Sequence, residues 1–133
     1  KETSGGKKRK DPPEEPYAMK IHYIEIVTPE MEEIVEKYSA LYNVDFKKGD
    51  PMLGGARTIK LENGGMMGIR PPMHDKEKSV TRNYVLVKDI EASVNKAKEL
   101  GAEIAVPPME VPGHGQCAII IHDGGQESGF WQL

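Results

Sequence analysis

The feature that most constrains this chain is an internal repeat. Residues 22–28 read HYIEIVT, and residues 83–89, which begin 61 positions later, read NYVLVKD. The same shift places residues 61–69, LENGGMMGI, on residues 122–130, HDGGQESGF. One offset therefore aligns an opening strand, a helix start, a glycine turn and a closing strand, which indicates two copies of one supersecondary unit. A cavity between the two copies is the expected place for a functional site.

Length and composition predict one soluble, globular domain. The chain has 133 residues, of which 38% are hydrophobic and 29% are charged. Its net charge of -3 does not favour nucleic acid or a membrane surface as a partner. No apolar run approaches the roughly 20 residues of a transmembrane helix. The single cysteine, Cys117, excludes a disulfide framework and favours a cytoplasmic location, with an exported form after signal removal as the open alternative.

The start of the chain differs in composition from the rest. The first 16 residues contain two glycines and three prolines but no aliphatic residue. We therefore expect residues 1–18 to be a disordered or extended tail, whose basic run KKRK is solvated. Residues 19–133 are expected to form a single domain made of two repeats, 19–71 and 79–133.

Each unit is predicted to contain a strand, a helix and three further strands. In unit one, Thr28 and Pro29 are typical of a helix start, and Asn63-Gly64 indicates a hairpin turn. In unit two, Asp89 caps the helix and Gly101 closes it. The proline- and glycine-rich segment 107–115 is predicted to be a mobile loop that could cover the cavity. The predicted strands are 20–27, 44–48, 57–62, 65–70, 81–88, 102–106, 116–122 and 127–133.

The tandem units resemble the vicinal oxygen chelate superfamily, which includes glyoxalase I, extradiol dioxygenases and bleomycin resistance proteins. The resemblance rests on the unit-two sequence from Asp89 through LGA at 100–102, on DGG at 123–125 and on GFWQ at 129–132. The last motif is nearer to the uncharacterised glyoxalase-like branch. The resemblance implies an α+β fold in which tandem βαβββ units form a curved mixed sheet around a central cavity, with the helices on the outer face.

The resemblance also implies where a metal ion would lie. Enzymes of the superfamily usually hold a metal with His, Gln or Glu from the first and last strands of each unit. The matching positions here are His22, Gly68, Asn83 and Gly129. Glycine has no ligating side chain, an asparagine amide is a poor ligand for zinc, nickel or iron, and one imidazole does not make a site. We therefore expect no metal and no other cofactor.

The repeat and the alternation of side chains along strands together predict one concave surface that binds a ligand. His22 is the first candidate for a ligand contact or a general base, and Glu127 is the candidate for its carboxylate partner. Each has a structural alternative, which is a hydrogen bond between strands for His22 and a solvated rim position for Glu127. The expected lining residues are His22, Ile24, Met66, Gly68, Asn83, Val85, Glu127, Gly129 and Trp131.

The remaining polar candidates have mainly structural interpretations. Glu25 alternates to the face opposite His22, where we expect it to pair beneath a helix or at an interface. Cys117 has no neighbour in sequence that would lower its pKa, which favours a packed thiol. His114 lies in the predicted loop and is either exposed or a contact from a lid over the cavity.

Two functions fit these observations. The first is metal-independent binding of a small organic molecule, favoured by a largely apolar cavity with a few polar groups. The second is a metal-free isomerase or lyase that uses His22 with Asn83 or Glu127 in proton transfer, which requires hydrogen-bond reach between His22 and Glu127. An interaction module whose cavity is filled by side chains is a third possibility. We expect a homodimer, because related proteins pair their units with a partner and exposed strand edges need covering.

Overall fold

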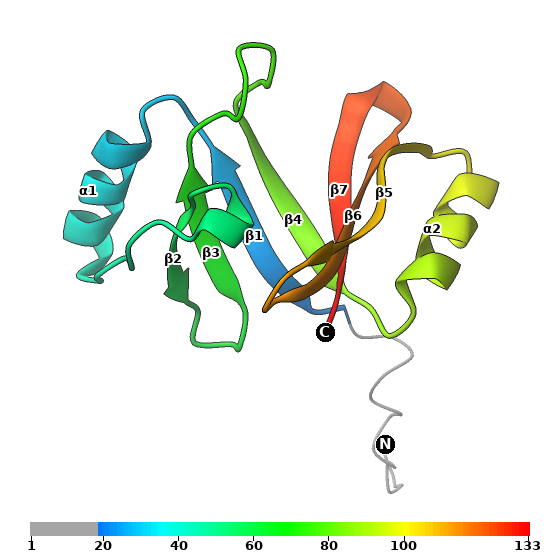
Figure 1. The fold of residues 1–133 in the computed structure, drawn as a ribbon, viewed down its shortest axis with the longest axis horizontal. Coiled ribbons are helices and arrows are strands. Elements are labelled where there is room, and N and C mark those ends of the chain that lie inside the picture. The colour runs from blue at the N-terminus through cyan, green and yellow to red at the C-terminus, as the bar shows by residue number, and fades with distance from the viewer. Residues whose placement is uncertain (1–18) are drawn as a thin grey trace, which may run out of the picture.

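The computed structural model describes residues 19–133, which form one seven-stranded mixed sheet and two α-helices (Figure 1). The tail predicted at residues 1–18 lies outside the described residues. The elements in chain order are β1 (Ile21–Val27), α1 (Met31–Tyr42), η1 (Pro51–Leu53), β2 (Arg57–Lys60), β3 (Met66–Arg70), β4 (Val80–Leu86), α2 (Ile90–Glu99), β5 (Glu103–Val111), β6 (Gly115–His122), η2 (Asp123–Gly125) and β7 (Gln126–Gln132).

The sheet has the same arrangement in both units. Its strand order is β2-β3-β1-β4-β7-β6-β5. The first strand of each unit pairs in parallel with the last, β1 with β3 and β4 with β7, and β1 and β4 join the units as antiparallel neighbours. Figure 1 shows α1 beside the unit-one strands and α2 beside the unit-two strands. The predicted α+β fold, a curved mixed sheet built from tandem units, is confirmed.

The ends of the two helices can be compared with the helix-start and helix-stop residues in the sequence. The N–H of Ala92 donates to Oδ1 of Asp89 at 3.0 Å, so Asp89 caps α2 as predicted. Helix α1 begins at Met31, later than the start predicted at Thr28 and Pro29, and its N-cap residue Glu30 makes no side-chain capping bond; Thr28 Oγ1 accepts from the N–H of Glu30 in the turn before the helix. Asn43 ends α1 in the left-handed conformation, with φ of 56°.

Unit one has one strand fewer than predicted. Residues 44–48 are not a strand, although the N–H of Lys47 donates to the carbonyl of Thr58 at 2.8 Å. Phe46 in this segment is buried with Val35 of α1 and Ile69 of β3. The Arg57 side chain of β2 also donates to the carbonyls of Lys47 and Phe46, so isolated hydrogen bonds hold the segment beside β2 without a continuous ladder.

The loop predicted at 107–115 is instead mostly a strand, and that prediction is wrong. Strand β5 continues to Val111, which pairs with Gly115 of β6, so only a short turn containing His114 remains. Register shifts between Ile104 and Met109 accommodate the two prolines of β5. Strands β5 and β6 therefore form a long hairpin at one end of the curved sheet.

The edges of the sheet are β2 and β5, and both are protected from further pairing. Strand β2 has only four residues, and β5 carries Pro107 and Pro108, which have no N–H to donate. The need to cover open edges is therefore a weaker reason for a dimer than the sequence suggested.

Separate core clusters lie on the two faces of the sheet. On the outer face, Val35, Phe46 and Ile69 pack with α1, and Ile90, Val94 and Ala118 pack with α2. The concave face has its own cluster, which draws on both units and so joins them. That cluster contains Tyr23, Leu53, Ala56, Tyr84, Val111, Cys117 and Trp131.

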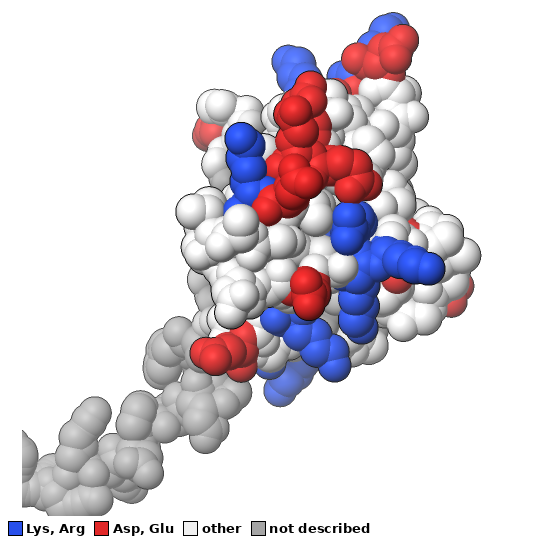
Figure 2. All heavy atoms as spheres, turned by 90° about the vertical axis from the view of Figure 1, so that its left-hand side faces the viewer, with Lys and Arg blue, Asp and Glu red and all other residues white. Residues whose placement is uncertain are grey.

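The surface near α1 carries charges of both signs. Figure 2 shows this side, where acidic side chains gather in one area and basic side chains gather next to it. One ion pair there joins Arg57 to Glu32 at 2.9 Å. Within residues 19–133, no helix is long and apolar enough to cross a membrane.

Candidate functional site

A cavity of about 420 Å³ lies on the concave face of the sheet. One side is formed by β1, β3, β4 and β7, and the other by the β5–β6 hairpin, which contributes Val106, Ile119 and Ile121. The lining is mainly apolar. A row of charged side chains crosses it.

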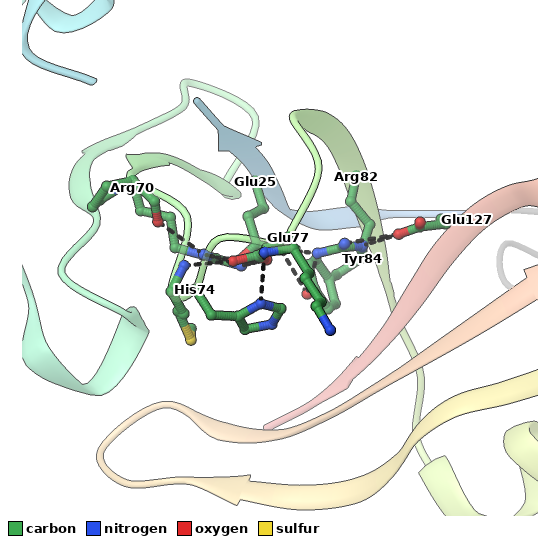
Figure 3. Close-up of polar contacts among 10 residues, drawn as sticks. Glu25, Arg70, His74, Glu77, Arg82, Tyr84 and Glu127 are labelled. Carbon is green, nitrogen blue, oxygen red and sulfur yellow. Dashed lines mark hydrogen bonds and ion pairs between the residues drawn. The ribbon is translucent and has the colours of Figure 1, made fainter. Parts of the chain in front are cut away.

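The row begins at the unit-one side with Arg70 of β3. Its Nε donates to Oε2 of Glu25 at 2.7 Å, and its two terminal nitrogens donate to the two oxygens of Glu77 at 3.0 and 2.6 Å. Glu77 is held in turn by the N–H of Met73 at 2.7 Å. Figure 3 shows how these side chains converge from β1, β3 and the linker between the units.

The row continues through Glu25 into unit two. The carboxylate of Glu25 accepts from Nη1 of Arg82 and, at 2.8 Å, from the hydroxyl of Tyr84. Arg82 also donates from Nε and Nη2 to Oε1 of Glu127, at 3.0 and 2.7 Å (Figure 3). Glu25 is therefore the shared acceptor that connects the arginines of the two units.

Pairing fixes the charge state of these groups. Burial alone lowers the pKa of Arg70, but Glu77 and Glu25 outweigh it and hold the pKa above its usual value. Hydrogen bonds from Arg70 lower the pKa of Glu77 to about 2. Burial, and then the charge of Glu25, raise the pKa of Tyr84, so its hydroxyl stays protonated and donates.

Three aromatic rings form the floor beside the row. Tyr23 and Tyr84 occupy equivalent positions in the two units, and both contact Trp131, with ring centroids 5.4 and 5.5 Å apart. The rings lie over glycines. A Cβ added to Gly68 would be 2.8 Å from Cζ of Tyr23, and one on Gly129 would be 2.6 Å from Cε2 of Tyr84. The repeated glycines therefore make room for the repeated tyrosines.

Solved structures with a similar fold are known, although by sequence the chain matches no protein-family profile and no curated protein. A hypothetical protein from Bacillus halodurans superposes with a TM-score of 0.69 and 16% identity, covering 87% of this chain and 95% of its own. Methylmalonyl-CoA epimerase from Streptomyces coelicolor gives a TM-score of 0.60 and 15% identity over 84% and 95% of the two chains. The Mycobacterium tuberculosis epimerase gives 0.62 and 12% over 84% and 86%.

The chain has the vicinal oxygen chelate fold. The predicted resemblance is thereby confirmed at the level of structure. Identities of 16% and below do not carry an activity across, because this scaffold supports many chemistries.

Within this vicinal oxygen chelate fold, the candidate residues of β3 and β7 lie on the concave side of the sheet. Met66 packs against the concave core cluster, and Glu127 and Trp131 line the cavity. Gly68 and Gly129 also face this side, since a Cβ on either would meet a cavity tyrosine.

Three residues of β1 and β4 that were predicted to line the cavity point away from it. Ile24 lies between Tyr23 and Glu25, which both line the cavity, so Ile24 points to the outer face. Asn83 is exposed between two cavity residues of β4, and Val85 faces a groove beside α2. Their predicted place on the concave surface is wrong, because a shift of one residue moves a strand's side chains to the other face.

His22 is not among the residues that line the cavity, although its ring contacts Trp131, which is. Pairing between β1 and β4 shifts register between Ile21 and Tyr23, and the His22 ring packs on Trp131 with centroids 5.6 Å apart. Burial, and then the charges of Lys20 and His114, lower the pKa of His22. The imidazole is therefore neutral at neutral pH. Its ring packs against Trp131, beside the three aromatic rings of the cavity floor.

Several central residues of the site were misplaced or not singled out from the sequence. Glu25 was expected on the other face, yet it is buried at the middle of the charged row. Arg70, Arg82 and the two tyrosines were not singled out. The available signal was that Tyr23 and Tyr84 occupy matching repeat positions, as do Gly68 and Gly129.

Two other candidates have structural contacts. Nε2 of His114 lies 2.8 Å from Oδ2 of Asp50, and the His114 carbonyl accepts from Nε1 of Trp131 at 2.8 Å. These contacts fix the β5–β6 turn against both units. Cys117 lines the cavity, but burial raises its pKa to about 11, so it is a protonated thiol at neutral pH.

The metal positions of the fold do not fit a metal ion in this chain. Tyr23 and Tyr84 fill the space over Gly68 and Gly129. Residues 19–133 contain no group of three or more His, Cys, Asp or Glu side chains placed to hold a metal. The absence of a bound metal in the purified protein stays a prediction.

The two floor tyrosines are expected to respond differently to loss of the hydroxyl. Tyr84→Phe removes a hydrogen bond to the Glu25 carboxylate and should cost about 1.5 kcal/mol of unfolding free energy. The buried hydroxyl of Tyr23 has no hydrogen-bond partner in residues 19–133, so Tyr23→Phe should change stability by less than about 0.5 kcal/mol or raise it. Urea unfolding measures both, and equal losses would contradict the assigned contacts.

Proposed function

We propose that this protein binds a small organic molecule in the cavity between its two units, without a metal ion. The observation that carries the proposal is the cavity itself, because about 420 Å³ of mainly apolar lining with a few converging polar groups is typical of small-molecule sites. The cavity also draws its lining from both repeats, which supports a site shared between them.

The structural neighbours support a small-molecule ligand in general terms. The Streptomyces coelicolor epimerase was solved with 2-nitronate-propionyl-CoA. A fold shared at 15% identity does not make CoA esters the ligand of this chain. The ligand class must come from the side chains of this cavity.

The enzyme alternative requires His22 to act with Asn83 or Glu127, and the structure does not support either pair. Asn83 lies on the outer face, and no hydrogen bond in residues 19–133 joins His22 to Glu127. His22 packs on Trp131 instead. Binding is therefore the better-supported function. A homodimer also stays a prediction, and the protected sheet edges remove part of its motivation.

Blocking the cavity should abolish binding without unfolding the protein. Ala105 lines the cavity yet is exposed, so Ala105→Phe adds a ring to the open space and leaves the core intact. Ligands found by a thermal-shift screen of small organic fragments should bind this variant at least about tenfold more weakly, which is about 1.4 kcal/mol.

The matched control is Ala92→Phe, which adds the same ring on α2 beside the outer groove. It should leave the affinity of the same fragments unchanged. Fragments whose affinity falls in the Ala92 variant but not in the Ala105 variant would place binding elsewhere.

A further inference from the structure

We propose that the ligand of this cavity is an organic cation, an ammonium group on an apolar body. The inference rests on the proposed function and adds the chemical class of the ligand. It is carried by the polar atoms that remain open in the cavity.

The open polar atoms of the charged row belong to carboxylates. The side chains of Arg70 and Arg82 are 4% and 7% exposed, whereas Glu77 and Glu127 are 17% and 33% exposed. A molecule entering the cavity therefore meets acceptors that carry negative charge. Figure 3 shows the two guanidinium groups in the same row, each between carboxylates or next to one.

Both guanidinium groups are already paired. Arg70 donates to Glu25, Glu77 and the carbonyl of Pro71, and Arg82 donates to Glu25 and Glu127. An anionic ligand would have to displace a carboxylate from a buried partner, which leaves that carboxylate without its counter-charge. The arrangement therefore disfavours anions.

Glu127 keeps one oxygen open. Both hydrogen bonds from Arg82 end on Oε1, and in residues 19–133 nothing donates to Oε2. The three carboxylates of the row exceed its two guanidinium groups by one negative charge, and the cavity lining contains no lysine and no histidine. An ammonium group at Oε2 would balance the row.

The rest of the lining suits the apolar part of such a ligand. Tyr23, Tyr84 and Trp131 line the floor, and aromatic rings attract organic cations as well as apolar groups. Exposed methionines, Met52 of unit one, Met73 of the linker and Met109 of unit two, line the cavity. Their flexible thioether side chains adapt to apolar bodies of different shape.

A trio of ligands that share one body tests the charge preference. Adamantylamine, adamantanol and adamantanecarboxylate are transparent in the near ultraviolet, so the fluorescence of Trp131, the only tryptophan, reports their binding. The amine should bind the wild-type protein at least tenfold more tightly than the carboxylate, with the alcohol between them. In Glu127→Gln, the amine should lose its advantage over the alcohol.

The matched control is Glu110→Gln, an exposed carboxylate of β5 outside the cavity lining, which should preserve the preference. Equal or tighter binding of the carboxylate to wild-type protein would overturn the cation assignment and leave the binding function standing. If none of the three ligands changes the Trp131 fluorescence or the melting temperature of the protein, both the cation assignment and the proposed binding function are wrong. The wild-type comparison decides both questions even if Glu127→Gln folds poorly.

Discussion

Glu25→Gln is expected to destabilise the protein by about 3–5 kcal/mol. The Glu25 carboxylate is buried and accepts from Arg70 on one oxygen and from Arg82 and Tyr84 on the other. An amide removes the negative charge between two buried guanidinium groups. It also turns an N–H₂ group toward one of their donors. The loss is measured as the change in unfolding free energy from urea titration.

Glu32→Gln is the matched control, because it removes a carboxylate from a different Arg–Glu pair. The Arg57 and Glu32 side chains are 29% and 69% exposed, and exposed pairs contribute about 0–1 kcal/mol. A loss of about 1 kcal/mol or less for both variants would show that Glu25 does not connect the two units. A large loss only at Glu25 would confirm that it does.

The repeat accounts for most of what the sequence predicted correctly. A single offset relates Tyr23 to Tyr84 and Gly68 to Gly129, and the structure places each pair at equivalent positions of the two units. Local signals such as the Asp89 cap are also readable, because they depend on neighbours within one helical turn. The fold was therefore predictable from the internal repeat, and helix ends such as the Asp89 cap were predictable from short-range contacts.

The face of each first strand was not readable in the same way. His22 and Asn83 occupy equivalent positions in the two units. Because the sequence analysis expected His22 on the concave side, it expected Asn83 there as well. The register shift between Ile21 and Tyr23 changes which residues of β1 face the cavity, and β-irregularities of this kind have no reliable sequence signature. One error of parity therefore misplaced residues in both units.

Long-range pairing explains why the charged row was missed. Arg82 and Glu25 are separated by 57 residues, and Arg82 and Glu127 by 45. Charged residues in strands are usually interpreted as exposed, because a buried charge is costly unless it is paired. Only the fold reveals that Glu25 has two guanidinium partners.

The glycines of the closing strands give the second large expected effect. Gly129→Ala should cost about 3 kcal/mol, because its Cβ would overlap the Tyr84 ring and lie 2.9 Å from Cγ, near the fixed base of that side chain. The backbone is not the obstacle, since Gly129 does not have a positive φ. Urea unfolding again gives the free energy, and Ser128→Ala, one residue away on the other face, is the control.

The two glycines should differ in how they can be rescued. At Gly68 the added Cβ meets the hydroxyl end of Tyr23 first, so combining Gly68→Ala with Tyr23→Phe should recover about 1 kcal/mol of the loss. At Gly129 the overlap is with ring carbons, so Tyr84→Phe should not restore stability and should add its own loss of the Glu25 hydrogen bond. Rescue of Gly129→Ala by Tyr84→Phe, or no coupling at Gly68, would contradict this packing of the cavity floor.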